Sequence, residues 1–192
     1  MKTQIEKIDQ FIKSLDYEIQ LALDSVSTDC NFKKGDIIVR EGQVCKFSYH
    51  FIDGVGRKFY LDDTKEITTE FYFPDDLAVV FDSYVFQSPS KEYIECLSDV
   101  TLSITHFDKF NKLKEKYPKL VEFDLLMTEI YASWLEQRMF EFRTLDATQR
   151  YHKLLKSYPH FVKHISLTHI ASYLGISLET LSRIRAKQTY LT

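Results

Sequence analysis

The segment from residue 166 to 187, SLTHIASYLGISLETLSRIRAK, limits the possible folds more than any other part of the chain. Directly after Ser166, a good N-cap, apolar residues recur at the three- and four-residue spacing of one helix face. Gly175 follows, where a helix commonly ends in a left-handed residue. Ser177 then caps a second apolar-periodic run, with Glu179 in its first turn, where the helix dipole favours an acid. Two short helices joined by a tight turn with glycine are a helix-turn-helix.

The charge distribution favours a polyanion as the partner of this end of the chain. Residues 147–192 contain seven Lys and Arg against one acidic residue, a net charge of +6, and since the whole chain carries -3, residues 1–146 carry −9. A solvated surface hairpin with a basic face is the alternative reading. Because the caps, the glycine, the apolar spacing and the charge agree, we interpret the segment as a DNA-binding motif.

In such a motif the N-terminal part of the second helix enters the major groove. Arg183 can donate two hydrogen bonds to guanine, Glu179 can accept one from cytosine, and Leu178 can contact a thymine methyl group. The remaining candidates for DNA contact, mostly to phosphates, are Ser166, Thr168, Ser177, Thr180, Ser182, Arg185 and Lys187.

The rest of the chain divides into a β-rich region between helical regions. Residues 1–28 have helical periodicity. Residues 29–105 contain four of the five glycines and short β-rich runs separated by turn signals such as KKGD and DGVG, which predicts a small antiparallel barrel or roll. After Pro118, a long helix is expected to run to about Arg143.

The predicted long helix has two apolar stripes, and both must be buried. The first stripe is Leu120, Phe123, Met127, Ile130 and Trp134, and the second is Val121, Leu125, Ala132, Leu135, Met139 and Phe142. One stripe can cover the β-rich region and the other a twin helix in a homodimer, while a central helix within one domain is the alternative. The expected dimer interface consists of Phe123, Met127, Ile130 and Trp134.

With these elements in view, the chain resembles the Crp/Fnr family of bacterial transcription regulators over nearly all its length. KKGDIIVREGQ (33–43) is similar to the family's early β-hairpin, and LTHIASYLGISLETLSRI is similar to its DNA-reading motif, including the Ser-x-Glu-Thr-x-x-Arg pattern that ends at Arg183. On that pattern Glu179 and Arg183 are implied to read bases. Leu178 departs from it, because a basic residue or glutamine often stands there.

The resemblance implies an α+β chain of three parts. These are a cyclic-nucleotide-binding-like β-roll of the jelly-roll type over residues 1–115, a dimerisation helix over residues 116–144, and a winged helix-turn-helix over residues 145–192. It also implies a non-enzymatic sensor that binds a palindromic operator in double-stranded DNA, with RNA polymerase and a small-molecule effector as further partners.

The expected sensor region lacks the family's cyclic-nucleotide cassette, in which a Gly-Glu pair, an Arg and a Ser or Thr hold the cyclic phosphate. Residues 71–93 contain no glycine and no arginine, so we expect that cyclic AMP is not the ligand. No cofactor is expected either. A weak effector pocket is expected at Phe73, Phe81, Ser88, Ser90 and Lys91, with plain core packing of the aromatic residues as the alternative.

Two other functions are less well supported. The first is a cyclic-nucleotide-responsive regulator with an atypical phosphate site at residues 88–91. The second is a cupin-like β-barrel enzyme, which would need a His/His/Glu metal set, whereas residues 29–107 contain only His50 and His106 as histidines.

Three widely spaced cysteines indicate free thiols rather than a disulfide framework or a metal site. With no signal-peptide pattern and no apolar run long enough to span a membrane, a cytoplasmic location is expected.

Overall fold

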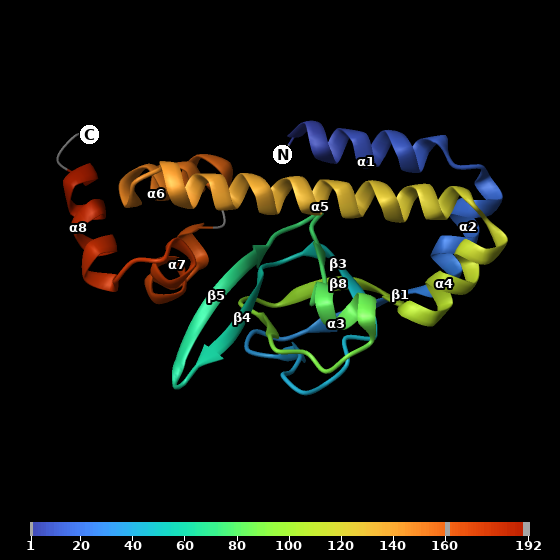
Figure 1. Ribbon diagram of the computed structural model, residues 1–192, viewed down its shortest axis with the longest axis horizontal. Helices are drawn as coiled ribbons and strands as arrows, with labels where there is room; N and C mark the ends of the chain where they lie inside the picture. Colours follow the sequence, from blue (N-terminus) through green and yellow to red (C-terminus); the bar gives the residue numbers. More distant parts are fainter. Residues whose placement is uncertain (1, 160–161, 190–192) are drawn as a thin grey trace.

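The computed structural model of the chain describes residues 2–159 and 162–189 and has an α+β fold (Figure 1). A β-roll lies beneath the long helix α5, which leads from the helices at one end of the roll to the C-terminal helices at the other. The helices are α1 (Lys2–Ser14), α2 (Tyr17–Val26), α3 (Phe81–Phe86), α4 (Phe107–Lys116), α5 (Lys119–Thr144), α6 (Ala147–Ser157), α7 (Leu167–Leu174) and α8 (Leu178–Thr189), with a 3-10 turn, η1, at Val162–His164. The strands are β1 (Ser27–Phe32), β2 (Ile37–Val39), β3 (Phe47–Asp53), β4 (Gly56–Asp62), β5 (Lys65–Tyr72), β6 (Leu77–Ala78), β7 (Tyr93–Cys96) and β8 (Val100–His106).

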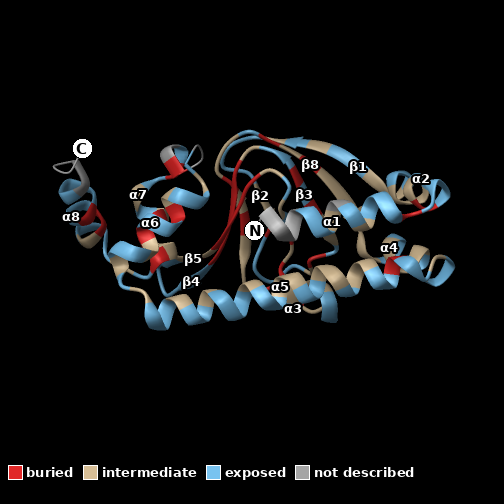
Figure 2. Ribbon diagram, turned by 90° about the horizontal axis from the view of Figure 1, so that it is seen from above, coloured by how far each residue is buried: buried red, intermediate tan, exposed pale blue. Residues whose placement is uncertain are grey.

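The expected antiparallel roll is confirmed. One sheet has the strand order β1-β8-β3-β6 and the other β2-β7-β4-β5, and all pairings are antiparallel. Phe51, Ile94 and Leu102 are fully buried in the core of the roll. Figure 2 shows buried segments, in red, along the strands of the roll. The turn between β3 and β4 requires glycine, because Gly54 has a φ of +91° and a Cβ atom there would lie 2.4 Å from the carbonyl oxygen of Asp99.

Helix α5 begins directly after Pro118 and extends to Thr144, close to the predicted end. Helix α1 runs alongside it (Figure 1), and the rings of Phe11 and Phe123 are 5.8 Å apart. On the side of the roll, Tyr131 stacks on Phe81 of α3 with ring centroids 5.0 Å apart. The helix is therefore held between the N-terminal helix and the roll.

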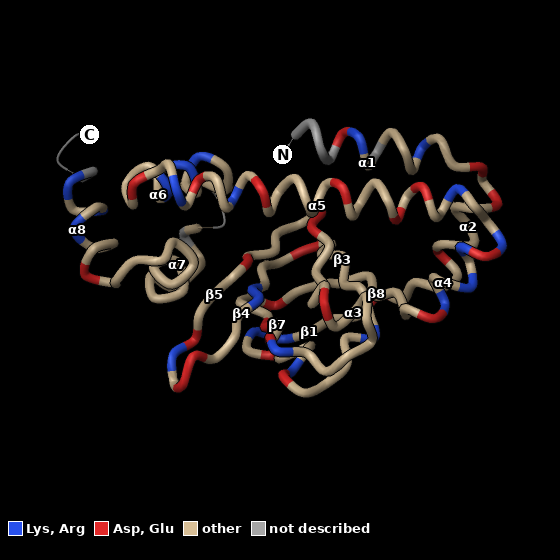
Figure 3. Tube along the Cα trace, in the orientation of Figure 1, with Lys and Arg blue, Asp and Glu red and all other residues tan. Residues whose placement is uncertain are grey.

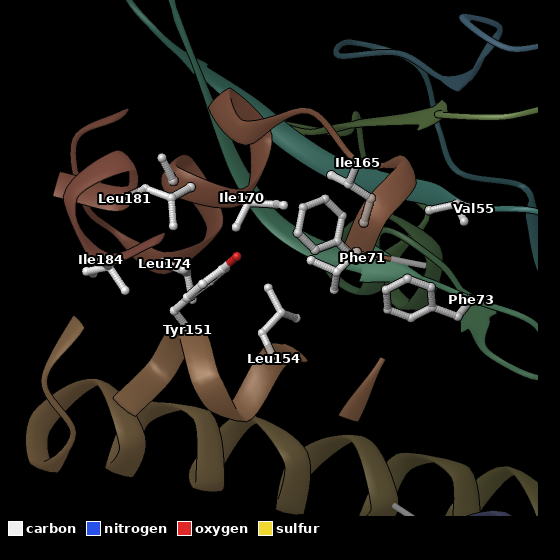
Figure 4. Close-up of a cluster of buried hydrophobic side chains, with 12 residues drawn as sticks. Val55, Phe71, Phe73, Tyr151, Leu154, Ile165, Ile170, Leu174, Leu181 and Ile184 are labelled. Atoms are coloured by element: carbon white, nitrogen blue, oxygen red, sulfur yellow. The ribbon is translucent and has the colours of Figure 1, made fainter. Parts of the chain in front are cut away.

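The C-terminal helices share one hydrophobic core with the roll (Figure 4). The cluster joins side chains of α6, α7 and α8 to Val55, Phe71 and Phe73 of the roll, and so crosses the boundary between the expected domains. No strand occurs in the described residues after His106, so the wing expected beside the helix-turn-helix is not found among them. Strand β5 of the roll packs against α7 instead.

Three further observations concern the cysteines, possible metal ligands and the length of the helices. Cys30, Cys45 and Cys96 are free thiols, as expected. Among the described residues no group of His, Cys, Asp and Glu side chains has an arrangement that could hold a metal ion. No helix in the described part of the chain is both long and apolar enough to cross a membrane.

Candidate nucleic-acid interface

The predicted helix-turn-helix is present, with its signals at the expected places. The hydroxyl oxygen of Ser166 caps α7 by accepting a hydrogen bond from the backbone N–H of His169, at 3.2 Å. Gly175 ends α7 in the left-handed conformation, with a φ of 65°. The hydroxyl oxygen of Ser177 then accepts from the backbone N–H of Thr180, at 3.2 Å, in the first turn of α8.

Glycine at position 175 is favoured for a second reason. A Cβ atom at this position would lie 3.1 Å from Cε1 of Phe142, which belongs to α5. The turn of the motif therefore rests on the end of the long helix. The inner faces of α7 and α8 meet through Ile170, Leu174 and Leu181, all of which are buried.

The outer face of α8 is open to solvent. The exposed side chains on it are Leu178, Glu179, Ser182, Arg183, Arg185 and Lys187. Arg183 donates a hydrogen bond to the hydroxyl oxygen of Thr180, at 3.2 Å, which holds the guanidinium against the helix. Figure 3 shows Lys and Arg positions, in blue, along α6 and α8, so the basic residues of the tail lie on neighbouring helices.

Glu179 is an ionised acceptor at the start of α8. Hydrogen bonds from its own backbone N–H and from the hydroxyl of Ser177 lower its pKa, and the Arg183 charge lowers it further. A carboxylate in this state can accept a hydrogen bond from a base amino group. Of the other candidates, Thr168 is exposed on α7, and Ser166, Ser177 and Thr180 are engaged in capping.

Helix α7 is tied to the β4–β5 hairpin by contacts that the sequence did not predict. The backbone N–H of Thr68 donates to the hydroxyl oxygen of Ser172, at 2.9 Å, and that hydroxyl donates to the carbonyl oxygen of Glu66, at 3.0 Å. His169 lies beside the Glu66 carboxylate, at 3.9 Å. No local sequence pattern predicts these contacts, because they depend on how two segments about 100 residues apart in the sequence pack together.

Two buried, paired cations lie in the roll, and the first of them lies beneath α5. The buried ammonium of Lys58 lies 2.5 Å from a Glu70 carboxylate oxygen and 3.7 Å from Glu92. Glu70 also accepts hydrogen bonds from the hydroxyls of Tyr72, at 2.9 Å, and Tyr131, at 3.0 Å. Burial alone would lower the pKa of Lys58, but the two carboxylates raise it overall, so Lys58 is a cation within a satisfied network.

A second buried cation lies next to the first. Arg57 is 2% exposed and contacts the carboxylates of Glu66 and Glu95, and it donates to the hydroxyl of Thr68 at 3.3 Å. Since Glu66 also lies beside His169 of α7, this network connects the roll to the helix-turn-helix.

The expected effector residues are not gathered around one pocket. Phe73 stacks on Tyr158, with ring centroids 3.9 Å apart, whereas Phe81 stacks on Tyr131. The buried hydroxyl of Ser90 donates to the carbonyl oxygen of Glu92, at 2.7 Å. The carbonyl oxygen of Ser88 accepts from Ser83, at 2.6 Å, and Lys91 is exposed. The ring contacts of Phe73 and Phe81 favour core packing over a role in an effector pocket.

The four expected dimer residues are half-buried within the chain itself. Phe123 contacts Phe11 of α1, and Met127, Ile130 and Trp134 border a hollow between α5 and β5. The second apolar stripe of α5 is the open one, with the following exposed fractions: Val121 53%, Leu125 58%, Leu135 44%, Met139 56% and Phe142 41%. In the single chain the second stripe is therefore more exposed than the four residues expected at the dimer interface.

Comparison with known proteins shows the fold. No protein-family model and no curated protein matches the sequence. Among solved structures, FixK2 from Bradyrhizobium japonicum is similar at a TM-score of 0.73 and 20% identity, over 86% of this chain and 86% of that chain. The c-di-GMP responsive global regulator CLP from Xanthomonas campestris is similar at 0.70 and 13%, over 91% and 92% of the two chains.

A Crp/Fnr-family protein from Eubacterium rectale, described as a transcriptional regulator, is similar at a TM-score of 0.68 and 19% identity, over 93% of this chain and 86% of that one. The similarity covers the roll, the long helix and the C-terminal helices together. The chain therefore has the fold of the Crp/Fnr regulators.

Proposed function

We propose that this chain, which has the fold of the Crp/Fnr regulators, is a transcription regulator that binds a palindromic operator in double-stranded DNA as a homodimer. The observation that carries the proposal is α8, a capped second helix whose outer face is exposed and whose surroundings are basic. The function is non-enzymatic and is exerted in the cytoplasm, with RNA polymerase as a further partner.

The roles on α8 follow from the chemistry of the exposed side chains. Arg183 donates two hydrogen bonds to guanine, Glu179 accepts one from cytosine, and Leu178 contacts a thymine methyl group. Arg185, Lys187 and the hydroxyl groups at the starts of α7 and α8 contact the phosphates. These contacts bind any sequence and position the helix in the groove.

The second stripe of α5 supports the dimer. Its positions 121, 125, 128, 132, 135, 139 and 142 alternate steps of four and three, which is the heptad spacing of a coiled coil. A twin α5 packed along this stripe would cover the exposed apolar side chains. The two copies of α8 would then stand on either side of the two-fold axis, as a palindrome with half-sites about 34 Å apart requires.

We further propose that cyclic AMP is not the effector. Among the described residues, the buried cations of the roll are Arg57 and Lys58, and both are already paired with carboxylates. A cyclic phosphate entering here would have to compete with Glu70 and Glu95 for them. An effector acts on DNA binding only if it favours the DNA-competent arrangement of the two halves.

Selection of binding sites from a random DNA pool tests the proposal. The wild-type protein should enrich a two-fold-symmetric site, and Arg183→Ala should lose or relax preference at one base pair of each half-site, worth about 1–3 kcal/mol. Arg143→Ala, an exposed arginine of α5 outside the motif, is the matched control and should select the wild-type site. Enrichment of the same site by Arg183→Ala would refute the assigned reading role, and no enrichment by the wild type would refute sequence-specific binding.

A further inference from the structure

A hollow with a volume of about 190 Å³ lies where α5, α6 and α7 meet. Three basic side chains border it, Arg138 of α5 and Arg150 and Lys153 of α6, against one acidic side chain, Glu141. Lys153 is ion-paired with Glu141. The two guanidinium groups have no carboxylate partner among the described ion pairs, so the hollow carries uncompensated positive charge.

The two guanidinium groups are fixed in place and still have donors to spare. Arg150 donates to the carbonyl oxygens of Leu145, at 2.7 Å, and Leu174, at 3.1 Å, while its Nε atom is buried without a hydrogen-bond partner. Each terminal nitrogen of Arg150 uses only one of its two N–H groups in these bonds, so a second N–H on each remains for an anion in the hollow. Arg138 donates to the carbonyl oxygen of Tyr173, at 3.1 Å, and also hydrogen-bonds the Tyr173 hydroxyl.

Aromatic rings form the rest of the wall. Arg138 lies over the ring of Tyr173, at 3.8 Å from its centroid, and Arg150 lies over Phe142, at 4.9 Å. Trp134 and Tyr158 also border the hollow. A bare inorganic anion would leave these rings without contact, whereas an acid attached to a flat apolar body can use both the guanidinium groups and the rings.

We propose that this hollow binds a small organic anion, an aromatic or similarly flat carboxylate, whose acid group is received by Arg138 and Arg150. The position suits an effector site, because the ligand would touch the long helix and the helix-turn-helix at once. Phe142, which borders the hollow, also contacts the turn at Gly175. An effect of this ligand on DNA affinity rests on the proposed function, but its binding does not.

Trp134 is the only tryptophan of the chain and borders the hollow, so its fluorescence reports binding directly and without DNA. The probes are benzoate and phenylacetate, and the controls are their neutral amides, benzamide and phenylacetamide. The anions should change the emission with saturation, and the amides should bind at least about tenfold more weakly, since they lack the charge. Equal affinity of acids and amides, or no saturable change with either acid, would overturn the proposal.

Variants locate the site. Arg138→Gln and Arg150→Gln should each weaken the anions about tenfold or more, whereas Arg143→Gln, an exposed arginine outside the hollow, should bind them as the wild type does. Circular dichroism verifies that each variant is folded. Arg150→Gln loses the contacts with the Leu145 and Leu174 carbonyl oxygens. If it therefore fails to fold, Arg138→Gln and the comparison of acids with amides still test whether the hollow binds the anions. Unchanged affinity in a folded Arg138→Gln protein would refute the assignment.

Discussion

On α8 and in the turn before it, some residues stabilise the backbone conformation and others are exposed to solvent. Ser177 caps the helix, and Gly175 supplies the left-handed turn that a side chain would strain. Glu179 and Arg183 lie on the exposed side. Glu179 accepts hydrogen bonds from its own backbone N–H and from Ser177, and these bonds help to keep its carboxylate ionised. Substitutions in the first group should therefore change stability, and those in the second should change DNA binding.

Gly175→Ala should destabilise the protein more than Gly35→Ala. Both glycines have a positive φ, which costs a non-glycine residue about 1 kcal/mol, but only at position 175 would the new Cβ also meet a side chain, Phe142. Urea unfolding of the two variants and the wild type measures the difference. Equal losses of unfolding free energy would show that the turn does not rest on Phe142.

The titration of Asp76 should make the free energy of unfolding depend on pH. Burial raises its pKa to about 7 in the folded protein, and nearby Asp75 and Glu70 add to this. The folded state then holds this proton when the unfolded chain has lost it, so the free energy of unfolding should fall as pH rises from about 4 to about 7. Since the side chain is only half-buried, we expect a decline of about 1 kcal/mol from this group.

Asp76→Asn isolates that contribution. Its amide oxygen can still accept the hydrogen bond from the backbone N–H of Phe73, at 2.8 Å in the wild type, but the side chain does not titrate. Urea unfolding at several pH values should show a flatter profile for the variant. A profile parallel to that of the wild type would mean that Asp76 titrates normally.

At the scale of elements, the sequence predicts what is local and misses what is not. The roll, the span of α5 and the two helices of the motif follow from turn signals, apolar periodicity and caps, all of which act over a few residues. Both stripes of α5 were identified, but which one the chain covers depends on where α1 lies. The pairing of Ser172 with the β4–β5 hairpin and the burial of Lys58 likewise depend on tertiary contacts.

The exposed stripe of α5 leads to a prediction about assembly. Leu125→Glu combined with Leu135→Glu should convert a dimer into a monomer, because two carboxylates on each helix would face each other across an apolar seam. Leu21→Glu, at a comparably exposed leucine of α2, should leave the dimer intact. Sedimentation velocity measures both. A dimer that persists in the double variant would place the interface elsewhere.

At the scale of the whole molecule, α5 connects the parts that the proposed function needs. It contacts the roll through Tyr131, exposes the second stripe to a partner, and supports the turn of the helix-turn-helix through Phe142. The hydrophobic core shared by the roll and the C-terminal helices makes these parts one packed body in this arrangement (Figure 4). Any change in the angle of α5 would thus move α8.

Hydroxyl-radical footprinting on the selected operator tests the central claim, that two copies of α8 read successive major grooves, most directly. The wild-type protein should protect two patches related by two-fold symmetry, about one helical turn apart. The Leu125→Glu, Leu135→Glu double variant should lose this paired protection at the same protein concentration. A single protected patch with the wild-type protein, or paired protection that survives in a variant shown to be monomeric, would contradict the account.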